Sequence, residues 1–166
     1  MLDADPVEID ANNFRQLAEH GRGQFRVGQY ESADEFLEAA LRLGRGSVFG
    51  DLQQGPVVHA YATWLGESRL ECMELLSECS LHLGRHREVV GSLFSLIAEH
   101  PLREAFYRLL MIALYRSDRQ ADALEVYRAA RARLSSEIGL EPCRSLQDLH
   151  NTILAGSTSL DELMAA

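Results

Sequence analysis

"HPLREAFYRLLMIALYRSDRQADALEVY", residues 100–127, decides the fold class of this chain. Apolar residues lie three and four positions apart up to Tyr115, a short polar run Ser-Asp-Arg-Gln follows, and the same spacing then resumes. This is the pattern of two amphipathic helices joined by a tight turn. The stretch carries no nucleophile beside a base and no metal-ligand pair, so it predicts a helical hairpin and not a catalytic site.

The layout of this hairpin occurs three times in the chain. Each copy begins with a turn residue and ends with a small or apolar residue that packs between helices. The three copies are "GQYESA" (residues 28–33), "GRHREV" (84–89) and "DRQADA" (118–123). Gly84 and Asp118 are 34 residues apart, which is the tetratricopeptide period. Gly28 and Gly84 are 56 apart, one period plus a 22-residue insertion that holds a glycine-rich connection at 44–56. We predict three stacked hairpins whose close crossings use Gly21, Ala33, Ala40, Ala123 and Ala130.

The rest of the chain is predicted to be helical as well. Apolar periodicity and breakers place helices at 10–27, 31–43, 56–83, 86–99, 103–117, 119–137 and 143–155. Asp10 is expected to cap the first of them and Gly28 to end it. Only residues 1–9 alternate like a strand, and the tail 156–166 holds at most one capped turn at Ser159. The predicted fold class is all-α, a tetratricopeptide-like solenoid of about seven helices.

Composition and charge exclude several classes of protein. The 166 residues are 46% hydrophobic and 25% charged, as in a soluble globular domain, and no apolar run approaches the ~20 residues of a membrane helix. The N-terminus is acidic and three sparse cysteines indicate reduced thiols, so we expect a cytoplasmic protein. Net charge is −9 and all sixteen basic residues are arginine, which argues against unaided binding to nucleic acid.

No pattern indicates a catalytic site, a cofactor or a metal. His82 and His86 have the spacing of a helical metal pair, but they flank the expected break at Gly84 and are interpreted as an exposed turn pair. Cys72 and Cys79 are expected to be buried apolar side chains. Trp64 and Phe106 have core spacing and are expected to pack inside. The acidic stripe Glu71, Glu74 and Glu78 is either a solvated face or one wall of a concave surface.

Four stretches resemble a known family. They are "FGDLQQGPVV" (49–58), "LGRHREVV" (83–90), "HPLREAFYRLLMIALYRSDRQADALEVYRAAR" (100–131) and "EIGLEPCRSLQDLHNTIL" (137–154). The chain from about residue 2 to 154 looks like the bacterial transcriptional activator domain of the Streptomyces antibiotic regulatory proteins. In that family a winged-helix DNA-binding domain comes first, and the activator domain supports self-association and contact with the transcription machinery. The resemblance implies a non-enzymatic interaction module in the transcriptional regulation of secondary metabolite (antibiotic) biosynthesis.

The chain departs from the family because the winged-helix domain is absent from its sequence. Residues 1–9 resemble the last strand and the linker of that domain, residues 10–155 the activator domain, and 156–166 form a tail. We therefore expect no direct DNA binding by this chain. The uncovered end of the first hairpin predicts a homodimer, and the expected protein partner is a regulator or the transcription machinery.

Laying the tetratricopeptide register on the first helix of each hairpin predicts a partner-binding groove. Its side chains would form a basic, an acidic and a second basic stripe with aromatics between them, a mixture that suits a peptide of mixed charge. The alternative is that these are ordinary solvated side chains. The predicted groove residues are Arg15, Arg22, Phe25, Arg26, Glu71, Glu74, Glu78, His82, Arg108, Ile112, Tyr115 and Arg116.

Two other functions stay open at the level of sequence. A free-standing domain of this type could bind or transform a small molecule in a biosynthetic pathway, with residues 44–56 as a lid. It could also pair with an intact regulator and inhibit or support it. Neither reading has a motif of its own in the chain.

Overall fold

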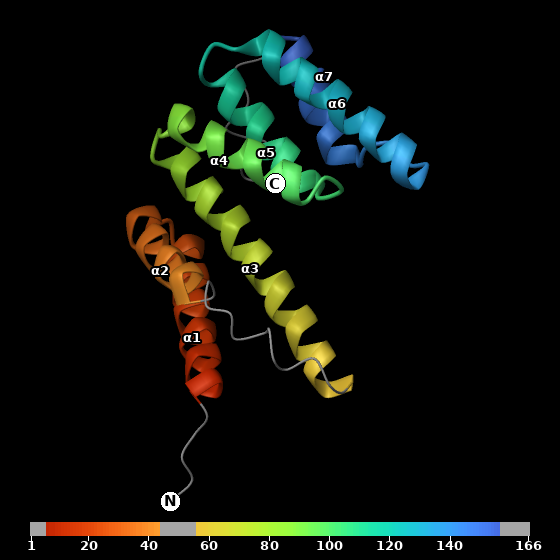
Figure 1. Cartoon of the computed structure of the whole chain (residues 1–166). Coiled ribbons are helices and arrows are strands. Elements are labelled where there is room, and N and C mark those ends of the chain that lie inside the picture. Colours follow the sequence, from red (N-terminus) through yellow and green to blue (C-terminus); the bar gives the residue numbers. More distant parts are fainter. Residues whose placement is uncertain (1–5, 44–55, 157–166) are drawn as a thin grey trace, which may run out of the picture. The chain divides into compact units, whose positions relative to one another are not determined.

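The computed structural model describes residues 6–43 and 56–156, and within these ranges it is built of seven helices without a strand (Figure 1). This confirms the predicted all-α class and the number of helices. The helices are α1 (Pro6–Arg26), α2 (Tyr30–Leu43), α3 (Pro56–His82), α4 (His86–Glu99), α5 (Glu104–Tyr115), α6 (Gln120–Ile138) and α7 (Arg144–Leu154).

The first helix begins earlier than the sequence predicted. α1 starts at Pro6, so Asp10 lies inside the helix and is not its N-cap. Proline suits the first helical position, because its fixed φ matches the helix and its missing N–H would have had no partner there. Residues 6–9, which resemble the end of a strand and a linker, are therefore helical. The glycine-rich connection and the tail turn at Ser159 lie outside the described residues.

The other helix boundaries agree with the prediction to within two residues. α3 continues through Gly66 without a break. The three turn positions of the repeat share one conformation, since Gly28, Gly84 and Asp118 have φ of 76°, 76° and 61°. This left-handed region suits glycine and, less often, aspartate. The repeat is thus visible in the backbone as well as in the sequence.

The helices fall into two compact units, Met1–Leu83 and Gly84–Ala166. The division passes between α3 and α4, that is, through the second of the three predicted hairpins. The first unit contains fourteen acidic residues and six arginines, a net charge of −8, and the second eleven and ten, a net charge of −1. Nearly all of the excess negative charge therefore belongs to the first unit.

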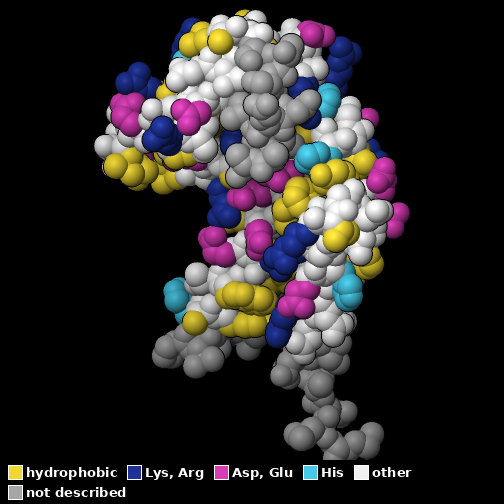
Figure 2. All heavy atoms as spheres, turned by 180° about the vertical axis from the view of Figure 1, so that it is seen from behind, with side chains coloured by type: hydrophobic (Ala, Val, Ile, Leu, Met, Phe, Trp, Pro, Cys, Tyr) yellow, Lys and Arg dark blue, Asp and Glu magenta, His cyan; other side chains and the backbone are white. Residues whose placement is uncertain are grey.

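The described surface mixes both signs of charge. On the face that Figure 2 shows, arginine side chains lie interspersed with aspartate and glutamate. In the part of the chain that the structure describes, no helix is long and apolar enough to cross a membrane.

In the first unit α2 packs against both α1 and α3, and α1 also contacts α3. The core between them is formed by small and aliphatic side chains, among them Phe14, Ala33, Leu37 and Ala40. Gly21 lets α1 approach α2 closely, because a Cβ built there would lie 2.7 Å from Cγ of Leu37. This confirms the predicted use of small residues where the helices cross.

In the second unit α5 is the central helix. It packs against α4, α6 and α7, and most of its side chains, from Phe106 to Leu114, are buried. Ala123 and Ala130 on α6 are completely buried, again as predicted for close crossings. On α7 the apolar stripe Leu146, Leu149 and Ile153 is buried, so this helix covers the last hairpin. Leu154, one position beyond Ile153, is 55% exposed.

Substitution of Gly21 tests the close approach of α1 and α2. Gly21→Ala should lower the free energy of unfolding by about 1 kcal/mol or more, because overpacking of a tight contact costs about 1–3 kcal/mol and outweighs the better helix propensity of alanine. Gly23→Ala is the matched control, since nothing lies within 4 Å of a Cβ there. It should raise the free energy of unfolding by roughly 0.5–1 kcal/mol. Urea unfolding of the two variants measures both; equal effects would contradict the packing at Gly21.

Candidate partner-binding surface

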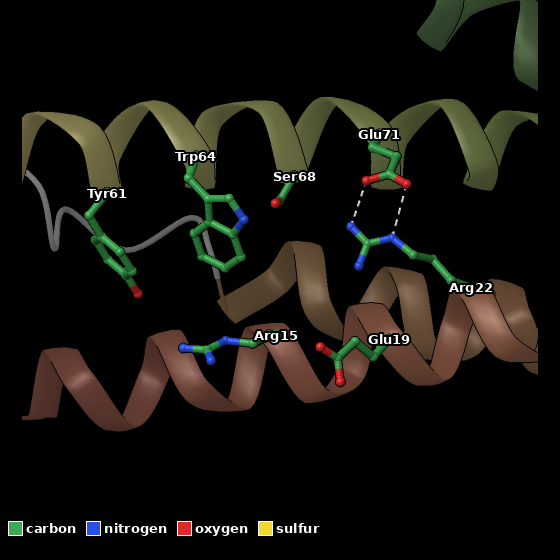
Figure 3. Close-up of a pocket in the computed structure, with 7 residues that line it drawn as sticks. All are labelled: Arg15, Glu19, Arg22, Tyr61, Trp64, Ser68 and Glu71. Atoms are coloured by element: carbon green, nitrogen blue, oxygen red, sulfur yellow. Dashed lines mark hydrogen bonds and ion pairs between the residues drawn. The ribbon is translucent and has the colours of Figure 1, made fainter.

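Two stripes of side chains face one another across the first unit (Figure 3). Residues from α1 lie three and four positions apart, as do those from α3, so each set shares one face of its helix. Together they line a hollow of about 520 Å³. The lining residues are Arg15, Glu19 and Arg22 from α1 with Tyr61, Trp64, Ser68 and Glu71 from α3.

The two stripes are in register with a constant offset of 49 residues. Arg22 reaches Glu71 with two hydrogen bonds, from Nε to Oε1 at 3.1 Å and from Nη2 to Oε2 at 2.7 Å. The side chain of Arg22 is 20% exposed and that of Glu71 is 49% exposed. A planar fork matched to a carboxylate in this way fixes the relative position of two helices better than a single contact does.

The opposite end of the hollow is aromatic. The guanidinium carbon of Arg15 lies 5.7 Å from the centre of the Trp64 ring, and Nη2 of Arg15 donates to Oδ1 of Asn12 at 3.0 Å. The ring of Tyr61 is 5.5 Å from that of Trp64. Trp64 is 38% exposed, so its predicted place in the core was wrong. The indole faces α1 across the hollow, whereas Phe106, predicted in the same way, is buried.

Between these ends lie Glu19 and Ser68. Figure 3 shows the carboxylate of Glu19 beside α1, between Arg15 and Arg22 along the helix. It makes no hydrogen bond or ion pair with any other residue that the structure describes. Ser68 is 7% exposed and belongs to the wall of the hollow on the α3 side.

Five predicted groove residues of the first unit are not among the residues that line this hollow: Phe25, Arg26, Glu74, Glu78 and His82. His82 stacks on Tyr30 with 4.0 Å between ring centres and an interplanar angle of 2°, and Phe25 meets both rings edge-on. Arg26 is exposed. Glu74 and Glu78 are half-buried on α3. His82 is therefore exposed, as predicted, and also belongs to an aromatic cluster, whereas His86 is half-buried.

His86 begins α4 in the second unit and is half-buried. Its Nδ1 is buried without a hydrogen-bond partner among the described residues. Burial, and then the charge of Arg116, lower the pKa of this imidazole, so it stays neutral to lower pH than an exposed histidine. Within the described ranges no three His, Cys, Asp or Glu side chains converge as metal ligands.

The α5 share of the predicted groove lies in the second unit. Arg108, Tyr115 and Arg116 are half-buried. Ile112 is 1% exposed and packs in the core, because α5 is covered on most of its circumference, so this side chain has no surface to offer a partner. The remaining large exposed apolar side chains of the described residues are Val27 in the first unit and Phe94, Leu102, Ile138 and Leu140 in the second.

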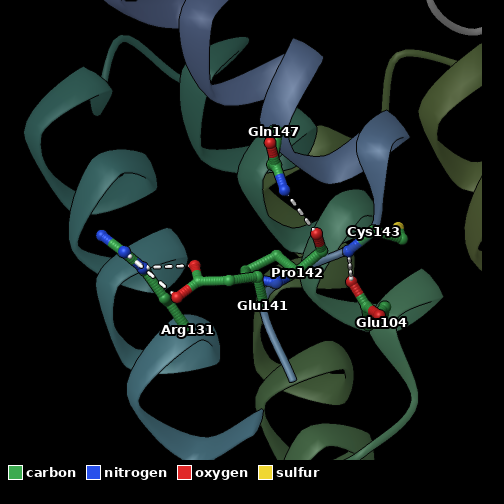
Figure 4. Close-up of polar contacts among 6 residues, drawn as sticks. All are labelled: Glu104, Arg131, Glu141, Pro142, Cys143 and Gln147. Atoms are coloured by element: carbon green, nitrogen blue, oxygen red, sulfur yellow. Dashed lines mark hydrogen bonds and ion pairs between the residues drawn. The ribbon is translucent and has the colours of Figure 1, made fainter. Parts of the chain in front are cut away.

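Polar contacts fix the connection from α6 to α7 (Figure 4). Arg131 donates to both carboxylate oxygens of Glu141, at 2.7 and 3.1 Å. The backbone N–H of Cys143 donates to Glu104 on α5 at 2.7 Å, and Nε2 of Gln147 donates to the carbonyl of Pro142 at 2.6 Å. The stretch "EIGLEPCRSLQDLHNTIL" (137–154) thus contributes at least one partner to each of these contacts.

The thiols behave as predicted. Cys72 and Cys79 are completely buried. Burial, against the nearby Arg22, raises the pKa of Cys72 to about 11, and burial together with Asp34 raises that of Cys79 to about 12. Both remain uncharged thiols at neutral pH and act as small core side chains.

A double-mutant cycle tests the contact between α1 and α3. Arg22→Ala, Glu71→Ala and the double variant should give a coupling free energy of about 0.5–1.5 kcal/mol, because the pair is bidentate and Arg22 is mostly shielded from water. The pair Arg42 and Glu38, one turn apart on α2 and more exposed, is the control and should give only about 0.3–0.5 kcal/mol. Equal coupling in the two cycles would show that the first pair does not hold α1 to α3.

Comparison with known proteins places this chain in a family. The model of the bacterial transcriptional activator domain matches residues 9–154. Regulatory protein DnrI of Streptomyces peucetius is 37% identical over 97% of this chain and 59% of its own length. Transcriptional regulator RedD of Streptomyces coelicolor is 38% identical over 93% of this chain and 44% of its own. The chain thus spans less than two thirds of either relative.

A solved structure agrees. Mycobacterium tuberculosis EmbR, in a complex with a low-affinity phosphopeptide, superposes on 98% of this chain and 44% of its own, with a TM-score of 0.87 and 32% sequence identity. Sequence and fold lead to the same assignment over nearly the whole length. The chain belongs to the bacterial transcriptional activator domain family, as its similarity to regulators of the Streptomyces antibiotic regulatory protein type also shows.

Proposed function

We propose that this chain is a non-enzymatic protein-interaction module in the transcriptional regulation of secondary metabolite biosynthesis, and that it binds a segment of its partner along the facing stripes of α1 and α3. The observation that carries the proposal is the hollow between these stripes, which is lined by Arg15, Trp64 and Tyr61 at one end and by the Arg22–Glu71 pair at the other. Tryptophan, tyrosine and arginine are the side chains that most often anchor protein interfaces.

The chemistry of the hollow favours binding over catalysis. Neither histidine, cysteine nor lysine is among its lining residues, and one of its two acids, Glu71, is held by Arg22. Ser68 therefore lacks the histidine or lysine that commonly activates a serine hydroxyl group. What the hollow offers is a set of fixed hydrogen-bonding groups and aromatic faces on rigid helices.

The family and the relatives support a partner in transcription. DnrI and RedD bear the names of regulators, and the EmbR structure contains a bound peptide. That peptide is a property of EmbR, of which this chain matches 44%, and supports a protein partner only in general. The candidate partners are the RNA polymerase holoenzyme, a second copy of this chain in a homodimer, and another regulator.

A small-molecule site is the second candidate function. The volume of the hollow lies within the ~300–1,000 Å³ of ligand pockets. Its walls, however, carry four charged side chains, whereas small-molecule sites are mostly apolar. A peptide that brings its own charges fits these walls better.

Binding to purified Streptomyces RNA polymerase holoenzyme, and to itself, tests the proposal. Biolayer interferometry with the immobilised full chain measures the first, and sedimentation velocity the second. Arg15→Ala and Trp64→Ala should each weaken the observed interaction about tenfold or more, because they remove anchors worth ≥ ~1.4 kcal/mol, while the melting temperature stays within a few degrees. Glu35→Ala on the outer face of α2 is the control and should leave binding unchanged.

Two results would contradict the proposal. One is that the chain binds neither the polymerase nor itself at micromolar concentration. The other is that binding survives both substitutions, or falls only as far as the melting temperature falls. Pathway metabolites that raise the melting temperature, in the absence of any protein binding, would favour the small-molecule function instead.

A further inference from the structure

We propose that the open middle of the hollow between α1 and α3 receives a basic side chain, lysine or arginine, from the bound partner segment. This assignment presupposes the proposed function, because it names the chemistry of the partner at the same surface. It concerns one position, the gap between Glu19 on α1 and Ser68 on α3.

The register of the two helices creates this gap. Arg15 with Trp64 and Arg22 with Glu71 form two cross-helix contacts that are seven residues apart on both helices. Seven residues of α-helix span about 10.5 Å. Glu19 and Ser68 each follow the first contact by four residues, so they lie opposite one another between the two closed ends. No contact between them closes the middle, and the hollow opens there (Figure 3).

Of the two arginines at the ends of the hollow, Arg22 is paired with a carboxylate, whereas Arg15 has only the neutral partners Asn12 and Trp64 among the described residues. Arg22 gives two hydrogen bonds to Glu71 and is neutralised by it. Arg15 gives one hydrogen bond to Asn12 and lies over Trp64. Glu19 contributes a negative charge that no described residue pairs. Glu19 is therefore the acceptor in this hollow that lacks a partner among the described residues.

Comparison of the possible occupants selects a cation. A lysine or arginine head group would donate to the Glu19 carboxylate and to Oγ of Ser68, while its aliphatic stem covered the rings of Tyr61 and Trp64. A carboxylate in the same place would meet the charge of Glu19. An apolar side chain would remove water from Glu19 without a compensating bond, which is costly. Of these three occupants, only the basic side chain gives the Glu19 carboxylate an opposite charge.

The charge of the whole unit acts in the same direction. The first unit carries a net charge of −8, whereas the second carries −1. A negative field of this size attracts a basic segment during encounter and makes the association rate fall with rising salt. The net charge of the first unit and the unpaired Glu19 in the hollow thus both favour a positively charged partner segment.

Single-residue probes test the assignment on the full chain. The chain contains one tryptophan, so the indole N–H signal of Trp64 in a ¹⁵N-edited NMR spectrum reports on the hollow alone. We would titrate N-acetyl-arginine amide, N-acetyl-lysine amide, N-acetyl-norleucine amide and N-acetyl-glutamate amide. Both basic probes should shift the indole signal in a saturable manner, and their Kd should be at least fivefold lower than that of norleucine or glutamate.

Glu19→Gln separates charge recognition from simple stacking. It should raise the Kd of the arginine probe at least fivefold, whereas Glu35→Gln, which removes the same charge from an exposed position of the same unit, should change it less than twofold. Norleucine binding as tightly as arginine, an unchanged Kd in Glu19→Gln, or no saturable shift with any probe would overturn the assignment. If the probes fail while Trp64→Ala still abolishes polymerase or self-binding, the assignment falls alone. If no variant of the hollow alters protein binding, the proposed function falls, whatever the probes do.

Discussion

The close approach of α1 to α2 is the contact on which the first unit depends. Leu37 is completely buried against the backbone of Gly21, where a Cβ would lie 2.7 Å away. Because α2 also packs on α3, the distance between α1 and α2 sets how α1 lies beside α3. The facing stripes of Arg15, Arg22, Trp64 and Glu71 follow from that placement, and so does the hollow between them. The close apolar contact between α1 and α2 thus positions the polar surface between α1 and α3.

Most of the fold follows from local patterns in the sequence. Six helices have the boundaries that apolar spacing and turn residues predict, and the repeat positions Gly28, Gly84 and Asp118 share a left-handed backbone. The start of α1 was misplaced because Asp10 is a good cap and Pro6 a good first residue, and only the packing of the early turn decides between them. The division into two units at Leu83 could not be predicted, because a regular repeat suggests one continuous stack.

The site was predicted only in part. Arg15, Arg22 and Glu71 were placed on the groove from the repeat register, and the structure brings them to one hollow. Glu19, Tyr61 and Ser68 were missed, and Trp64 was assigned to the core, because helical spacing gives the face of a side chain but not what lies opposite. The constant offset of 49 residues between α1 and α3 is the missing information. The insertion between the first two hairpins sets that offset, and the 34-residue period does not contain it.

We propose that the α1–α3 surface holds the partner of this transcriptional activator domain. Photocrosslinking tests this most directly: a photoreactive amino acid replaces Trp64 in one sample and Glu35, on the outer face of α2, in another, and each is irradiated with RNA polymerase holoenzyme and, separately, alone. We expect cross-links to polymerase or to a second copy of the chain from position 64, and none above background from position 35. Cross-links from position 35 with none from position 64 would contradict it.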